Sequence, residues 1–80
     1  MNMSKEEFIL EYKGYAKIWA DYYSHLFESW NIEFEDLYQV GCLRLAEVYD
    51  KYEAGKSSPS TYAFLSVKFA IISYIKKIVV

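Results

Sequence analysis

The sequence predicts a small all-α domain of three helices, and three observations lead to this fold class. Apolar residues recur every three or four positions in three separate stretches, which is the spacing of one face of an α-helix. No stretch shows the apolar–polar alternation that is typical of a half-buried strand. The single proline falls between the second and third stretches, beside a glycine and two serines, and this composition indicates a loop between two helices.

The length and composition indicate one domain with a densely packed core. A chain of 80 residues buries only about 60–65% of the surface that it exposes when unfolded. Hydrophobic residues make up 54% of the chain and aromatic residues 20%, and each large ring can bury about 150–250 Å². We therefore expect a folded domain over residues 1–80 and not a disordered chain.

The first helix is predicted at about residues 4–28. Ser4 and Glu7 have the spacing of a capping box, in which the serine and the acidic residue satisfy each other's backbone N–H groups. The apolar face of this helix comprises Phe8, Tyr12, Tyr15, Ala16, Trp19, Tyr23 and Leu26. Residues 29–33 carry no strong pattern, so we expect them to connect this helix to the next.

The second helix is predicted at about residues 35–52, with acidic residues in its first turn. Its apolar face comprises Leu37, Gly41, Leu45, Val48, Tyr49 and Tyr52. A glycine inside a helix costs about 1 kcal/mol relative to alanine. We therefore expect that Gly41 marks a place where another helix approaches closely.

The third helix is predicted at about residues 60–77, after a loop over residues 53–59. Ser58 or Ser60 can cap it, and Pro59 suits the first turn. Its expected core face comprises Ala63, Val67, Ala70, Ile71 and Tyr74, and residues 78–80 are expected to form a short tail.

The sequence offers little support for an enzyme. The one histidine, His25, lies near the predicted end of the first helix, where it suits a helix C-terminus, and no triad-like pattern accompanies it. The one cysteine, Cys42, is interpreted as a small apolar residue. No phosphate-binding loop or metal-binding motif is present in the sequence, and the acids of residues 33–36 are interpreted as a solvated helix start. We predict no catalytic residue, no metal and no cofactor.

The sequence also predicts a cytoplasmic location. It contains no secretory signal pattern and no apolar run near the roughly 20 residues that span a bilayer, so no membrane contact is expected. A single cysteine fits a reducing compartment. Charge is unevenly distributed, because residues 1–53 hold eleven acids against five bases whereas residues 54–80 hold four lysines and no acid. A basic end hints weakly at nucleic-acid contact, but lysines in a last helical turn also complement the helix dipole.

One long motif and two short ones carry a more specific pattern. Residues 34–52 read FEDLYQVGCLRLAEVYDKY, residues 60–63 read STYA, and residues 70–76 read AIISYIK. In this order and spacing they resemble region 2 of the bacterial sigma-70 family, where the three motifs belong to regions 2.2, 2.3 and 2.4. The resemblance covers about residues 8–77 and implies a small three-helix, sigma-factor region 2-like fold. Amphipathic helices alone would explain the periodicity of the apolar residues. They would not explain the joint presence of Asp36, Gln39, Gly41 and the STYA motif at residues 60–63.

The resemblance implies a contact with RNA polymerase. In this family the region 2.2 helix binds the clamp helices of the polymerase β′ subunit. The implied core-polymerase-binding residues are Asp36, Gln39, Val40 and Leu43. Val40 replaces a residue that is usually acidic in the family, and Cys42 replaces a usual asparagine, so the surface is more apolar here.

The resemblance also implies a contact with the −10 promoter region. Promoter melting needs aromatic rings that stack on extruded bases, and the implied DNA-binding residues are Tyr62, Phe64, Lys68 and Lys76. Leu65 and Ser66 replace the tryptophan pair of housekeeping members. The expected DNA-facing row at positions 65, 66, 69, 72, 73 and 76 reads Leu, Ser, Phe, Ile, Ser and Lys, which is unusually apolar for a DNA-contacting face.

Two functions fit these observations. The first is a transcription-initiation subunit that binds β′ and promoter DNA. Because the sequence lacks a region 4, it is expected to be either one half of a split sigma factor that works with a region-4-like partner protein or a fragment of a longer sigma factor, and the split form is favoured. The second is a protein-interaction module that keeps the fold and binds polymerase or a regulator without melting DNA. Under the first function, the apolar row is covered by the partner, or by self-association until the partner arrives; an alternative is that it simply packs against the first helix.

Overall fold

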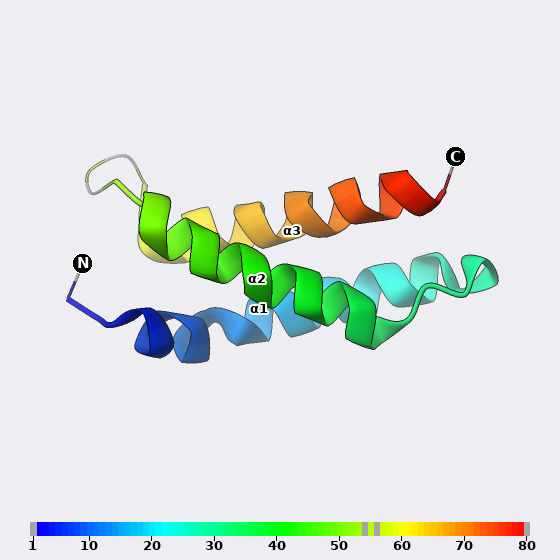
Figure 1. Ribbon diagram of the computed structural model, residues 1–80, viewed down its shortest axis with the longest axis horizontal. Coiled ribbons are helices and arrows are strands. Elements are labelled where there is room, and N and C mark those ends of the chain that lie inside the picture. The colour runs from blue at the N-terminus through cyan, green and yellow to red at the C-terminus, as the bar shows by residue number, and fades with distance from the viewer. Residues whose placement is uncertain (1, 54, 56, 80) are drawn as a thin grey trace.

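Three α-helices account for most of the chain, as predicted (Figure 1). The computed structural model describes residues 2–53, 55 and 57–79. Helix α1 spans Lys5–Leu26, α2 spans Phe34–Lys51, and α3 spans Pro59–Ile78, with a short 3-10 helix, η1, at Glu28–Trp30. Ala54 and Lys56 of the predicted loop and Val80 of the predicted tail lie outside the described residues. The all-α fold class is confirmed.

The helices lie along the long axis of an elongated body of 42 × 20 × 15 Å (Figure 1). Helix α2 runs in the direction opposite to α1 and α3 and crosses α1 near the middle of the molecule. Helix α3 lies alongside α2, so that the loop between them and the N-terminus are at the same end. Each helix contacts both of the others, and a single core forms between the three.

Side-chain caps set the beginnings of α1 and α3. The Glu7 backbone N–H donates to Ser4 Oγ over 3.1 Å, and the Ser4 N–H donates to Glu7 Oε1 over 2.8 Å, which confirms the capping box. The Thr61 N–H donates to Ser58 Oγ over 3.1 Å. Ser58 is therefore the cap, and α3 begins at Pro59, one position before the predicted start.

The end of α1 comes two residues before the predicted position 28. The backbone leaves the helix at Phe27, with φ −112°, and continues into η1. Asn31 then adopts the left-handed conformation, with φ 57°, which asparagine tolerates better than most residues. This turn redirects the chain so that Ile32, in a segment where the sequence showed no pattern, enters the core with only 6% of its surface exposed.

The core is formed largely by the apolar faces that the periodicity predicts. The buried residues are Phe8, Ala16, Ala20, Ile32, Leu37, Leu45, Val48, Ala63, Val67, Ile71 and Ile75. Ala20, Ile32 and Ile75 were not expected among them. The placement of Leu26 on the core face of the first helix was wrong, because its surface is 59% exposed. Phe27 and Ile32 fill the end of the core beside it.

Gly41 lies where α1 packs closely against α2, as expected for this glycine inside a helix. A Cβ atom at this position would lie 2.7 Å from Ala16 Cβ of α1 and 3.2 Å from Val67 Cγ1 of α3. Carbon atoms normally approach to about 3.5–4.0 Å. The absence of a side chain at Gly41 therefore permits the three helices to pack at their observed separation.

Aromatic rings of α1 join it to both other helices. The Phe8 ring lies 5.6 Å from the Tyr49 ring of α2. At the other side, the Phe64 ring of α3 lies 5.0 Å from both the Tyr15 and the Trp19 rings. Edge-to-face and tilted ring pairs of this kind contribute about 0.5–1.5 kcal/mol each beyond their buried area. They define which faces of α1 and α3 meet, and this matters for the candidate site below.

Candidate polymerase and nucleic-acid interface

The outer side of α2 presents the residues expected to bind polymerase. Asp36, Gln39 and Leu43 are exposed, and Val40 is half-buried. Their spacing of i, i+3, i+4 and i+7 places them on one side of the helix, away from the buried row that begins with Leu37. The Leu43 side chain has 69% of its surface exposed. The structure thus brings the four predicted residues together as one surface, with an apolar side chain among polar ones.

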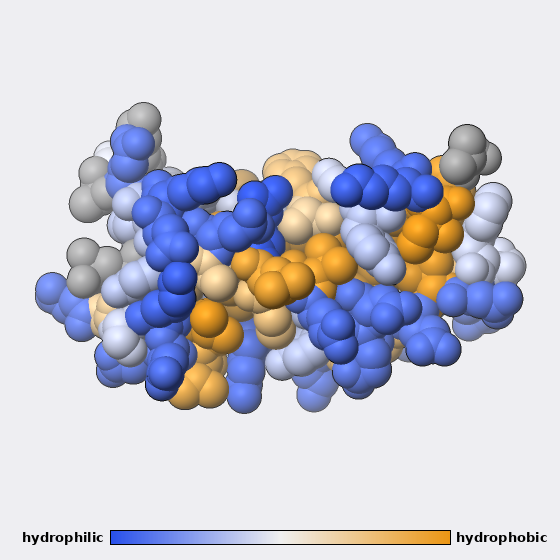
Figure 2. Space-filling view, viewed as in Figure 1, coloured by the Kyte–Doolittle hydropathy of each residue, from blue (hydrophilic) through white to orange (hydrophobic). Residues whose placement is uncertain are grey.

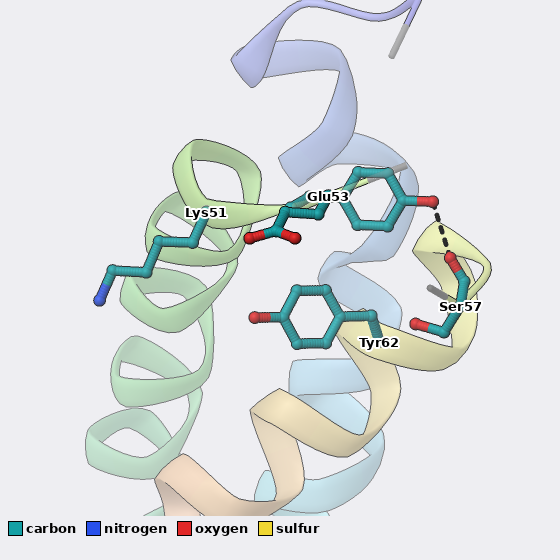
Figure 3. A pocket seen from close by; sticks show the side chains of 5 residues that line it. Lys51, Glu53, Ser57 and Tyr62 are labelled. Carbon is teal, nitrogen blue, oxygen red and sulfur yellow. Dashed lines mark hydrogen bonds between the residues drawn. The ribbon is translucent and has the colours of Figure 1, made fainter. Parts of the chain in front are cut away.

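A pocket of about 220 Å³ lies where α2 ends and α3 begins. Figure 3 shows Tyr62 of α3 facing the carboxylate of Glu53, with Lys51 on the α2 side and Ser57 on the opposite side. The Tyr52 ring forms a further wall, with its centroid 6.1 Å from that of Tyr62 and a tilt of 36°. The sequence did not single out Tyr52 as a site residue, although its place ten residues before Tyr62 was visible.

A hydrogen bond fixes one wall of this pocket. The Tyr52 hydroxyl donates to the Ser57 backbone carbonyl over 2.7 Å (Figure 3). The bond ties the last residue of the α2 face to the loop that precedes α3. The Tyr52 ring is therefore held at the edge of the pocket, across from Tyr62.

Phe64 and Lys68 lie on a different side of α3 from Tyr62. Phe64 packs between Tyr15 and Trp19, as described above. The Lys68 Nζ lies 5.1 Å from the centre of the Trp19 ring and 5.9 Å from that of Phe69, within the range of a cation–π interaction. Since successive residues on a helix are separated by about 100°, Tyr62 and Phe64 diverge by about 160°.

The apolar row of α3 is only partly covered by α1. Leu65 and Phe69 have 43% and 57% of their surfaces exposed. Ile72 is half-buried in a groove of about 240 Å³ between α1 and α3, together with Tyr23, Leu26 and Lys76. The structure therefore supports packing against α1 for Ile72 and leaves Leu65 and Phe69 outside that contact.

The one histidine, His25, and the one cysteine, Cys42, each contact a residue of their own helix. The His25 Nδ1 lies 2.8 Å from the Asp21 backbone carbonyl oxygen, and this hydrogen bond, with the Asp21 carboxylate, raises the pKa of His25. Cys42 is a free, half-buried thiol, and its hydrogen bond with the Tyr38 hydroxyl raises the pKa of that tyrosine. In the described part of the chain, no three metal-ligating side chains cluster. Among the same residues, no helix is long and apolar enough to cross a membrane.

The structure is a three-helix domain, and the comparison with known families identifies its class. The family model for sigma-70 region 2 matches residues 12–78. The chain therefore belongs to the sigma-70 region 2 family, whose members are non-catalytic domains that act in transcription initiation with RNA polymerase and promoter DNA. No curated protein and no solved structure matches the chain.

Proposed function

We propose that this chain is a transcription-initiation subunit that binds the β′ clamp helices through α2 and contacts the −10 promoter region near the start of α3. It would act as one half of a split sigma factor, together with a region-4-like partner. The observation that carries the proposal is the outer side of α2, where an exposed leucine stands among the polar residues that match the family's polymerase-contacting positions.

The chemistry of this surface suits a helical partner. Complete burial of a leucine side chain contributes about 1.5–3 kcal/mol, so Leu43 gives the contact much of its energy. Asp36 and Gln39 then fix its register, because polar groups that pair across an interface select among possible orientations. Val40 supports Leu43 from beside it and is already half-buried against the fold.

The pocket between Tyr52 and Tyr62 suits an unpaired base. Stacking of a base on an aromatic side chain contributes about 1–3 kcal/mol, and a base that enters the pocket would meet the Tyr62 ring. The Glu53 carboxylate can accept a hydrogen bond from an exocyclic amino group. Lys51, at the rim, can contact a phosphate. Of the four residues expected to bind DNA, Tyr62 has the surroundings that best support this role.

The polymerase contact is tested with the double variant Asp36→Ala, Gln39→Ala. Loss of a hydrogen bond to a charged group costs about 1.5–3 kcal/mol, so we expect affinity for purified core polymerase to fall at least tenfold in fluorescence anisotropy. Glu11→Ala, which removes an exposed carboxylate from α1, serves as the control and should bind normally. Unchanged affinity in the double variant, with its circular dichroism intact, would remove this assignment.

The DNA contact is tested by comparing Tyr62→Ala with Tyr62→Phe. With core polymerase and the partner present, Tyr62→Ala should reduce permanganate reactivity of the melted −10 region, since the stacking ring is lost. Tyr62→Phe keeps the ring and should retain most of the reactivity. If both variants melt DNA normally, the pocket has no part in promoter opening.

The partner is proposed from the exposed apolar row. Contiguous exposed apolar residues on a small domain commonly mark a contact site, and Leu65 and Phe69 are exposed on α3. We expect no promoter-specific transcript from this chain with core polymerase, and a specific transcript when a region-4-like protein is added. Specific initiation without any second protein would contradict the split arrangement.

A protein-interaction module without DNA chemistry is the second candidate. It is favoured by Lys68, whose ammonium group lies over the Trp19 ring, and by Phe69, an exposed apolar residue in the expected DNA-facing row. The two functions are separated by a gel-shift with single-stranded −10 DNA, run with and without core polymerase. A shift with polymerase that Tyr62→Ala abolishes supports the first function, and polymerase binding without any DNA shift supports the second.

A further inference from the structure

A groove of about 270 Å³ runs between α2 and α3, beside the surface proposed to bind polymerase. Helix α2 contributes Val40, Leu43, Arg44 and Glu47 to it. These residues follow the i, i+3, i+4, i+7 spacing, so the groove extends over two turns of α2, or about 10 Å. In Figure 2, apolar residues gather over the middle of the molecule in this region and are flanked by hydrophilic ones.

The opposite wall comes from α3 with the same spacing. It consists of Ala70, Ser73, Tyr74 and Lys77. Ala70 and Ser73 are small, so the groove is hollow between them and the α2 side chains. A hollow bounded by two helices accepts the side chains of a further helix, by the same packing of ridges into grooves that joins helices within a fold.

The charges in the groove are only partly matched. Arg44 Nη1 lies 3.7 Å from Glu47 Oε1, which is long for a charge-assisted hydrogen bond. The Arg44 Nε is buried and has no hydrogen-bond acceptor among the described residues. A partner cannot reach this buried atom, but the Arg44 side chain is 38% exposed, so its terminal Nη groups can pair with a carboxylate, the strongest acceptor that a protein can offer.

The α2 wall of the groove also carries groups that suit contact with a second copy of the chain. It offers an exposed apolar side chain, Leu43, and a carboxylate one turn later, Glu47. When two copies of α2 meet in antiparallel fashion about a two-fold axis between Arg44 and Glu47, each arginine faces the glutamate of the other copy. An isologous contact requires a self-complementary surface, that is, one whose charged groups pair with the same groups of a second copy.

We infer that the groove between α2 and α3 binds a second copy of this chain, forming a two-fold symmetric dimer through reciprocal Arg44–Glu47 pairs around Leu43. The groove also holds Lys77, so it carries two cations against one acid, but the exposed apolar side chain of Leu43 and the carboxylate of Glu47 favour a protein partner over a nucleic-acid backbone. The net charge of −2 opposes association only weakly. The dimer covers Val40 and Leu43, so, if the proposed function holds, it withholds the chain from polymerase.

The test is the oligomeric state of the purified chain, measured by sedimentation equilibrium from micromolar to millimolar concentrations without polymerase or DNA. The wild-type chain should dimerise. Arg44→Glu and Glu47→Arg should each weaken dimerisation at least tenfold, because each places like charges opposite one another. The double variant Arg44→Glu, Glu47→Arg reverses both partners and should dimerise like the wild type. Lys13→Glu, an equal charge reversal at an exposed site on α1, should have no effect.

Three results would overturn the inference. They are a chain that stays monomeric throughout, single variants that dimerise normally, and a double variant that stays dissociated while its circular dichroism spectrum matches the wild type. A dimer that is lost in Phe69→Ser but unchanged in Arg44→Glu would place the contact on the apolar row of α3 instead. Because polymerase is absent from these measurements, their outcome is separate from that of the proposed function.

Discussion

Replacing Gly41 with alanine tests whether close helix packing determines the stability of this domain. The added Cβ would lie 2.7 Å from Ala16 Cβ, about 1 Å inside a normal contact. Ala16 has no flexible end that could move away, so α1 and α2 must separate. Overpacking of this kind costs about 1–3 kcal/mol, and the gain in helix propensity returns about 1 kcal/mol. We expect a net loss of about 1 kcal/mol, and a fall in the unfolding midpoint of about 4–8 °C.

The assay is urea and thermal unfolding followed by circular dichroism, and Gly14 provides a matched control. Gly14 also lies inside a helix, but a Cβ there would meet nothing within 4 Å. Gly14→Ala should therefore stabilise the domain, by up to about 1 kcal/mol. The same substitution thus has opposite signs at the two positions. If Gly41→Ala stabilises the chain as much as Gly14→Ala does, the reasoning about Gly41 is refuted.

Three further predictions follow from single contacts. Ser58→Ala removes the α3 cap and should cost about 1 kcal/mol in urea unfolding, whereas Ser58→Asp should retain most of the stability. Phe64→Ala should lower the free energy of unfolding by about 2–3 kcal/mol, because Phe64 packs between Tyr15 and Trp19; a loss of DNA binding without loss of stability would contradict that role. The raised pKa of His25 implies stabilisation that is complete below its ordinary pKa of about 6.5 and lost as the pH rises through the raised value. Unfolding midpoints should therefore fall slightly between about pH 6 and about pH 8 in the wild type but not in His25→Gln.

The helices were predictable because their signals are local. The Ser4–Glu7 capping box and the position of Pro59 in the first turn of α3 both depend on residues within one turn, and the structure confirms both. The segment after α1 was not predictable in the same way. Ile32 is buried because Phe27 and Asn31 turn the chain back toward the core, and this is a property of the assembled helices that no periodicity over residues 29–33 reveals.

The residues of the candidate site also differ in how far the sequence could predict their arrangement. The four α2 residues share one side because their spacing within a single helix requires it, so the sequence could group them. The four α3 residues could not be grouped by resemblance alone, since their surroundings depend on the packing partner. Tyr62 reaches Tyr52 at the end of α2, whereas Phe64 and Lys68 meet the aromatic rings of α1.

Leu43 belongs to both surfaces of α2, and this overlap connects the two proposals. Gln39 lies on the outer side alone and Arg44 lines the groove, whereas Leu43 stands between them. A chain that dimerises through Arg44 must therefore separate before polymerase can reach Leu43, and mass action makes its apparent polymerase affinity fall as the chain becomes more concentrated. Arg44→Glu should remove that dependence on concentration, because it weakens the dimer and leaves Asp36, Gln39 and Leu43 in place. An affinity for polymerase that is independent of chain concentration in the wild type would show that the two contacts do not compete.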